Sequence, residues 1–139
     1  MSAKDKYHEH VKEALRKDGW EITHDPYILR VGERVKYEID LGAEKLIGAK
    51  KEHQKILVEV KSFLKESVIN EHHTVLGQYI NYRIHLRDTD ADRVLFLAIR
   101  LETYELLKEL PPLIKSFDEC NIKLIIIDID KLEIEEWIR

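Results

Sequence analysis

Two segments with the alternating pattern of β-strands carry charged side chains among apolar ones. Residues 34–41 alternate charged and apolar side chains, and residues 56–63 form an apolar run that contains Glu59 and Lys61. Because successive side chains of a strand point to opposite faces, Glu59 and Lys61 share one face while Val60 points to the core. Burying an unpaired charge is costly, so such side chains need a specific partner. The chain must therefore form a sheet in which these charges are neutralised.

The rest of the chain mixes helical and strand patterns. Apolar residues at helical spacing predict helices, which are residues 4–18, 67–87, 103–110 and 112–119. Alternating or continuous apolar runs predict strands, which are residues 20–23, 27–31, 34–41, 56–63, 94–99, 123–129 and 132–138, with a polar connection over 42–55. This order predicts a mixed α/β sheet between helices, with the early strands as antiparallel neighbours. The acidic strand 132–138 has the character of a protected sheet edge.

Length and composition are those of one globular domain. The chain has 139 residues, of which 44% are hydrophobic and 36% charged, and it contains no repeat or Pro/Gly/Ser linker, so we expect a single domain over residues 1–139. The single cysteine, Cys120, cannot form an internal disulfide and is expected to pack in the core. The N-terminus has no signal-peptide pattern, and no apolar run approaches the ~20 residues of a membrane span. We expect a cytoplasmic protein without a membrane partner.

The acidic residues of the two alternating segments predict a metal site. Asp40 lies near the end of the first segment, and opposed side chains on adjacent antiparallel strands come within ~5 Å of each other. Asp40 and Glu59 could therefore share a Mg²⁺ or Mn²⁺ ion, with the carbonyl of Val60 as a further ligand. Such an ion activates water and neutralises charge on a phosphoryl group, and Lys61 would position that water or stabilise the transition state. This arrangement is typical of enzymes that cut phosphodiester bonds.

Several of these residues also have simpler interpretations. Glu59 and Lys61 alone could be a surface pair, because a Glu-x-Lys triplet is common by chance. Glu38 could add a carboxylate or could be a solvated strand residue. Gln78, in the long helix, could orient a water or contact a phosphate, or could be merely exposed. Arg83 shares the apolar stripe of that helix, where an ion pair with a carboxylate would account for it.

Other functional classes lack their motifs in this sequence. The seven histidines include adjacent or closely spaced pairs that diverge on a helix, and no Cys-rich or His-Glu-x-x-His zinc pattern is present. The sequence contains no glycine-rich phosphate loop, Gly-x-Ser-x-Gly elbow or dinucleotide fingerprint. The net charge of −4 argues against a nonspecific nucleic-acid coat protein but not against a nuclease.

The same residues carry a resemblance to a known family. The segments IDLGAEKLI, VEVKSF and LGQYINYR, within a similarity over nearly the whole chain, resemble the XisH proteins, the fdxN element excision controlling factors of cyanobacterial DNA rearrangement. The resemblance implies a restriction-endonuclease-like PD-(D/E)xK fold, with Asp40 as the first acid, Glu59 and Lys61 as the (D/E)xK pair, and Gln78 at a helper position. Ile39 stands where this superfamily often has proline.

The resemblance also implies partners. It implies DNA, a XisI-like protein, a site-specific recombinase and a second copy of the chain in a homodimer. Related resolvases have a glutamate on the first helix, where this chain has His8, followed by Glu9. Whether His8 or Glu9 contacts a metal is left open by the sequence.

Three functions are consistent with this sequence. The first is a metal-dependent DNA endonuclease or nicking accessory factor, with cations of the 42–55 connection near the DNA backbone, namely Lys45, Lys50, Lys51 or Lys55. The second is a catalytically silent regulatory protein that keeps a nuclease-like fold and binds XisI or the recombinase, since fold does not dictate activity. The third is a toxin-like nuclease that a partner neutralises.

Overall fold

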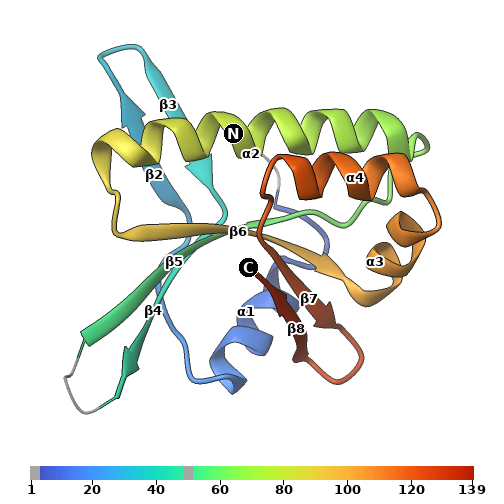
Figure 1. Ribbon diagram of the computed structural model, residues 1–139. Helices are drawn as coiled ribbons and strands as arrows, with labels where there is room; N and C mark the ends of the chain where they lie inside the picture. The colour runs from blue at the N-terminus through green and yellow to red at the C-terminus, as the bar shows by residue number, and fades with distance from the viewer. Residues whose placement is uncertain (1–3, 49–51) are drawn as a thin grey trace.

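The protein is built on one mixed β-sheet. The computed structural model describes residues 4–48 and 52–139 (Figure 1). Six strands lie in the order β1-β4-β5-β6-β7-β8, in which β5, β6 and β7 are parallel and the other neighbours antiparallel. The strands are β1 Glu21–His24, β4 Leu41–Ile47, β5 Glu52–Val60, β6 Arg93–Arg100, β7 Leu124–Asp128 and β8 Glu133–Ile138. The predicted mixed α/β sheet with antiparallel early strands is confirmed, and the acidic strand β8 is an edge strand.

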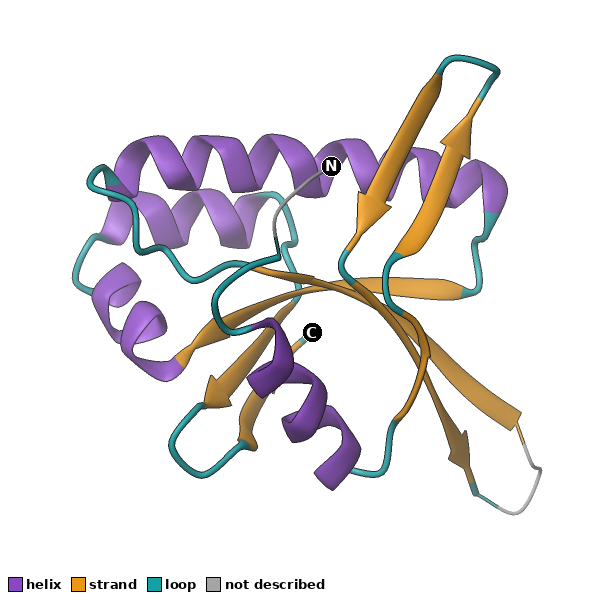
Figure 2. Ribbon diagram, turned by 180° about the vertical axis from the view of Figure 1, so that it is seen from behind, coloured by secondary structure: helices purple, strands orange, loops and turns teal. Residues whose placement is uncertain are grey.

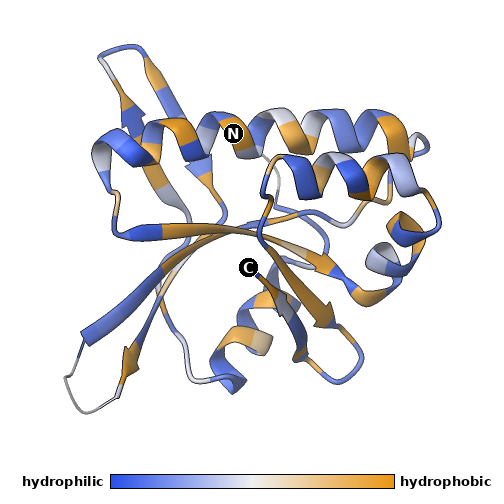
Figure 3. Cartoon of the chain, in the orientation of Figure 1, coloured by the Kyte–Doolittle hydropathy of each residue, from blue (hydrophilic) through white to orange (hydrophobic). Residues whose placement is uncertain are grey.

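Helices cover both faces of this sheet. Helix α1 (His8–Lys17) lies on one face, and α2 (Val68–Thr89), α3 (Leu101–Lys108) and α4 (Pro111–Glu119) pack on the other (Figure 1). The alternation of the strands divides the core, so that Leu57 faces α2 whereas its neighbours Ile56 and Val58 face α1. Strands β6 and β7 are apolar along most of their length because both of their faces are covered (Figure 3).

A separate two-stranded hairpin stands beside the main sheet. It consists of β2 (Tyr27–Val31) and β3 (Val35–Ile39), and Figure 2 shows it projecting past α2. The sequence predicted one strand over 34–41, but the chain bends at Asp40 and passes from the hairpin into β4 of the main sheet. Asp40 is therefore a junction between two sheets.

The predicted polar connection over 42–55 is wrong. Residues 42–47 belong to strand β4 and residues 52–55 to strand β5, which pair from Leu41 with Val58 to Ile47 with Glu52, while residues 49–51 lie outside the described part of the chain. The error has a physical reason, because the polar side chains of this extension find partners across strands. Glu44, for example, lies 3.6 Å from His53 and 3.7 Å from Arg93.

The polar residues of the core have defined partners. The hydroxyl of Tyr79 in α2 donates to the carbonyl of Leu95 at 2.6 Å and accepts the N–H of Lys123 at 3.2 Å. Tyr79 thus joins β6 to the residue before β7, just ahead of the first paired residues Leu97 and Leu124. Cys120 is half-buried at the end of α4 and packs, as expected, against the apolar cluster that contains Tyr79. In the described part of the chain, every helix is too short or too polar to cross a bilayer.

Tyr79→Phe is expected to destabilise the protein by about 1–3 kcal/mol, because the buried carbonyl of Leu95 and the partly buried N–H of Lys123 then lose their shared partner. Urea unfolding followed by circular dichroism measures this change. Tyr104→Phe is the matched control, since the Tyr104 hydroxyl has no hydrogen-bond partner among residues 4–48 and 52–139 and the residue is partly exposed. Equal stability of the two variants would contradict a structural role for the Tyr79 hydroxyl.

Candidate active site

Asp40 and Glu59 are held together by crossed hydrogen bonds. The register that pairs Leu41 with Val58 brings Asp40, just before β4, alongside Glu59, near the end of β5. The N–H of Asp40 donates to Glu59 Oε1 at 3.2 Å, and the N–H of Val60 donates to Asp40 Oδ2 at 2.8 Å. Each carboxylate is thus fixed by the main chain of the other segment. The predicted meeting of these two acids is confirmed.

The charge of this pair is only partly neutralised by the protein. Glu59 is 6% exposed, and its burial, together with the neighbouring Asp40 carboxylate, raises the pKa of Glu59 well above its usual range. Lys61 acts in the opposite direction, but its Nζ is 3.9 Å from Glu59 Oε2, which is long for an ion pair. Burial and the same two carboxylates also raise the pKa of the Tyr82 hydroxyl above its usual range. A cation at this position would relieve the repulsion.

The pair opens into a cavity of about 480 Å³. All five residues that the sequence predicted for the site line it, and the full lining is Asp5, Glu38, Asp40, Glu59, Val60, Lys61, Ser62, Leu64, Lys65, Glu71, Gln78 and Tyr82. The Oε1 atom of Gln78 is buried without a hydrogen-bond partner among the described residues. The interpretation of Gln78 as a merely exposed residue is therefore wrong, because its amide oxygen is buried at the cavity and accepts no hydrogen bond from the described residues. Burial of Glu59 likewise excludes a simple surface pair with Lys61.

Two further carboxylates of the cavity were missed from the sequence. Asp5 Oδ2 accepts the N–H of Ser62 at 2.9 Å, which ties the segment before α1 to the chain just after β5. Glu71, in the first turn of α2, is 7% exposed, and its Oε2 lies 3.5 Å from Lys65 Nζ. No local sequence pattern indicated a role for Asp5, since it bonds to Ser62, a residue 57 positions away in the sequence. Glu71 resembled an ordinary acidic residue of a helix start.

His8 and Glu9 do not join this site. His8 Nε2 lies 2.7 Å from Asp25 Oδ1, and Lys12 Nζ lies 2.7 Å from the other oxygen of Asp25. Burial opposes ionisation of Asp25, but the hydrogen bonds from Lys12 and His8 outweigh it and hold the pKa of that carboxyl below its usual value. Asp25 with His8 and Glu9 offers metal-binding atoms within 4.8 Å of one another. Lys12 already neutralises this cluster, which serves to link α1 to the end of β1.

The basic residues of the 42–55 segment do not surround the cavity. Lys45 donates to the main-chain carbonyl of Asp18, and its ammonium lies 5.6 Å from the Trp20 ring. Lys55 stands opposite Glu44 on the β4–β5 pair, several residues before Glu59. These two lysines are therefore not placed as expected beside the site, and Lys50 and Lys51 lie outside the described residues.

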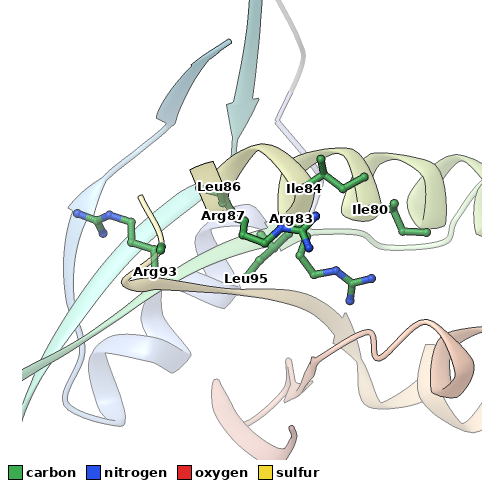
Figure 4. Close-up of a pocket in the computed structure, with 8 residues that line it drawn as sticks. Ile80, Arg83, Ile84, Leu86, Arg87, Arg93 and Leu95 are labelled. Carbon is green, nitrogen blue, oxygen red and sulfur yellow. The ribbon is translucent and has the colours of Figure 1, made fainter. Parts of the chain in front are cut away.

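A second cavity, of about 440 Å³, lies beside the C-terminal half of α2 (Figure 4). Its lining is apolar with three arginines and no carboxylate, namely Ile80, Arg83, Ile84, Leu86, Arg87, Ala91, Arg93 and Leu95. The predicted carboxylate partner of Arg83 is wrong, because Arg83 Nη1 donates to the carbonyls of Cys120 and Asn121 at 2.6 and 3.1 Å. Arg83 thus caps the end of α4. A cavity without oxygen anions is no candidate for the metal.

Comparisons with known proteins agree with this architecture. The family model described as XisH protein matches residues 1–135. The crystal structure of an XisH family protein from Nostoc punctiforme PCC 73102 is 43% identical, with 97% of this chain and 100% of that chain covered and a TM-score of 0.87. That of a fdxN element excision controlling factor protein from Anabaena variabilis is 44% identical, with 98% and 100% covered and the same TM-score of 0.87. No curated protein matches the sequence. The chain belongs to the XisH family.

Proposed function

We propose that this protein is a metal-dependent endonuclease of the restriction-endonuclease-like PD-(D/E)xK type, which acts on DNA in the control of programmed element excision. The observation that carries the proposal is the crossed pair of Asp40 and Glu59 beside Lys61 in an open cavity. The relative from Anabaena variabilis is named as a fdxN element excision controlling factor, which supports the proposed biological setting.

The residues of the cavity fit a hard divalent cation. Asp40 and Glu59 supply carboxylate oxygens and Val60 a carbonyl, which are the ligand types that Mg²⁺ and Mn²⁺ prefer. The buried Oε1 atom of Gln78, which has no hydrogen-bond partner among the described residues, and the raised pKa of Glu59 both indicate a site that is electrostatically incomplete. When bound, such an ion lowers the pKa of a water ligand and offsets charge on the phosphoryl oxygens.

The remaining steps fall to the side chains. The main-chain N–H of Val60 keeps Asp40 in one orientation, so that its free oxygen can be directed into the cavity. Lys61 would hold the attacking water or stabilise charge that develops on the phosphoryl oxygens. The Gln78 amide, from helix α2, would orient a water or a phosphate oxygen.

The proposed partners follow from the family resemblance. DNA is the substrate, while a XisI-like protein and a site-specific recombinase would supply the context in which cleavage or nicking is used. A second copy of the chain would form a homodimer. Strand β8 is not suited to pairing with that copy, since its exposed Glu133, Glu135 and Glu136 protect the edge.

Cleavage assays test the proposal directly. Purified protein, alone and with its XisI-like partner, is incubated with supercoiled, linear and four-way branched DNA in Mg²⁺, in Mn²⁺ and in EDTA. We expect metal-dependent nicking or linearisation, and Lys61→Met should slow it about 10²–10³-fold, as for loss of other transition-state stabilising groups. Lys115→Met, on the exposed surface of α4, is the control. DNA that stays intact in every mixture would contradict the proposal and favour a regulatory protein with a silent site.

A further inference from the structure

The β2–β3 hairpin packs against α2, and its turn projects past that helix (Figures 1 and 2). Tyr37 packs on α2, where its ring centre lies 5.4 Å from that of Tyr82 and 5.9 Å from that of His85. Buried Leu29, which pairs with Tyr37, belongs to the same apolar cluster. The turn at Gly32, where φ is +68°, lies past α2 and away from the main sheet (Figures 1 and 2). The hairpin is therefore an arm held by a rigid helix.

One face of this arm continues into the cavity. Lys36, Glu38 and Asp40 are two residues apart and lie on the same side of the chain, with Arg30 directly across from Lys36. Glu38 and Asp40 line the cavity. At ~3.3 Å per residue, the turn residue Arg34 lies about 20 Å from Asp40 along the strand. A ligand with a reacting group at Asp40 and an extended body would therefore pass along this face.

The arm carries three cations, Arg30, Arg34 and Lys36, against two acids, Glu33 and Glu38, so its net charge is opposite in sign to that of the cavity. Arg30 and Arg34 are exposed and have no ion-pair partner within residues 4–48 and 52–139. Lys36 lies 3.7 Å from Glu38 and is partly offset by it. The cavity has five carboxylates and only two lysines, so it repels a polyanion unless cations nearby compensate. Arg30 supplies such a cation on the face that continues into the cavity, and Arg34 adds a second one at the adjoining turn.

We propose that the β2–β3 hairpin binds the backbone of duplex DNA next to the cavity, with Arg30 and Arg34 on phosphates. The proposal rests on the proposed function, because the DNA is the substrate of the same site. The major groove, ~12 Å wide, admits a two-stranded β-ribbon, and arginine is suited to bidentate phosphate contacts. A protein partner fits this face less well, since Ile28 is its one exposed large apolar residue and interfaces are usually centred on apolar or aromatic anchors.

A salt titration of DNA binding tests the arm. The probe is a fluorescein-labelled 30-base-pair duplex in EDTA, where cleavage does not interfere, and anisotropy is recorded from 50 to 300 mM salt. Arg30→Ala/Arg34→Ala is compared with Arg87→Ala/Lys115→Ala, which removes the same charge from exposed positions on α2 and α4. We expect the hairpin variant to bind at least about tenfold more weakly and to lower the slope of log K against log salt by about 2. The control variant should change affinity less than about twofold.

The outcomes separate this inference from the proposed function. Equal affinity of the two variants, or no binding of the duplex by the wild type, would overturn the inference. Loss of binding to a protein partner with unchanged DNA affinity would overturn it as well. Cleavage of DNA by a hairpin variant that binds like the wild type would remove the inference and leave the proposed function in place. DNA binding that depends on the hairpin, without cleavage in Mg²⁺, would support the inference and contradict the proposed function. Unchanged melting temperatures confirm that both variants are folded.

Discussion

Asp40→Asn is expected to lower the rate of Mg²⁺-dependent DNA cleavage by about 10²–10³-fold and to abolish measurable Mg²⁺ binding. The reason is that the amide lacks the negative charge that holds a hard cation. The fold should persist, because the amide oxygen can still accept the Val60 N–H that now donates to Asp40 Oδ2 at 2.8 Å. Initial rates on a supercoiled plasmid measure the first effect and isothermal titration with MgCl₂ the second.

The control for this experiment is Asp130→Asn. Asp130 is an exposed acid in the turn between β7 and β8, outside the cavity, so the same loss of charge should leave both cleavage and Mg²⁺ binding unchanged. If Asp40→Asn cleaved DNA at the wild-type rate, Asp40 would not be a metal ligand. If it lost Mg²⁺ binding yet supported element excision in cells, the cavity would serve a regulatory role instead of hydrolysis.

The core of the site could be predicted because it depends on local rules. Strand alternation correctly placed Val60 in the core and Glu59 on the opposite face, as the buried clusters confirm. The pairing of two successive strand segments brought Asp40 to Glu59 without knowledge of the rest of the fold. The continuous apolar runs of β6 and β7, in turn, correctly predicted strands of the interior, which the structure buries along most of their length.

The remainder of the site depends on contacts that sequence patterns do not report. Asp5 reaches the cavity only because the segment before α1 bonds to Ser62, and nothing near Asp5 in sequence indicates that contact. The bend at Asp40 was also hidden, since the alternation of residues 34–41 continues through it although the chain changes sheets there. Lys45 carries the right charge for DNA, but its direction was decided by Asp18 and Trp20. The metal-binding chemistry of Asp40 and Glu59 could therefore be predicted from the sequence, whereas the arrangement of the residues around them could not.

Because Glu59 is buried beside the Asp40 carboxylate, its negative charge is expected to lower the stability of the fold while serving activity, and the two effects can be measured separately. The wild type keeps Glu59 buried beside Asp40, and natural proteins tolerate such unfavourable groups chiefly where activity needs them. Because the pKa of Glu59 is raised in the folded state, the native protein retains a proton that the unfolded chain has already lost. Stability therefore falls as pH rises from the usual glutamate range, near 4.5, up to the raised pKa of Glu59, and changes no further from this group above it.

Glu59→Gln should remove that loss of stability and, at the same time, lower the cleavage rate by about 10²–10³-fold. We expect the melting temperature of the variant to match the wild type near pH 4 and to exceed it by about 3–6 °C at pH 8 in EDTA, corresponding to about 1 kcal/mol. Mg²⁺ at pH 8 should stabilise the wild type and not the variant, because ions that bind only the native state raise its stability. Differential scanning calorimetry from pH 4 to 9, with and without Mg²⁺, measures both effects.

Glu135→Gln, on the exposed face of β8, controls for the loss of one acid from the chain. Subtracting each variant's melting temperature from that of the wild type cancels the titration of groups that do not interact with the substituted residue, so the pH dependence that remains belongs to that residue and its close charged neighbours. A difference for Glu59→Gln that is flat with pH would mean that Glu59 titrates alike in both states. That result would contradict the buried, mutually repelling carboxylate pair, and with it the reason for a cation between Asp40 and Glu59.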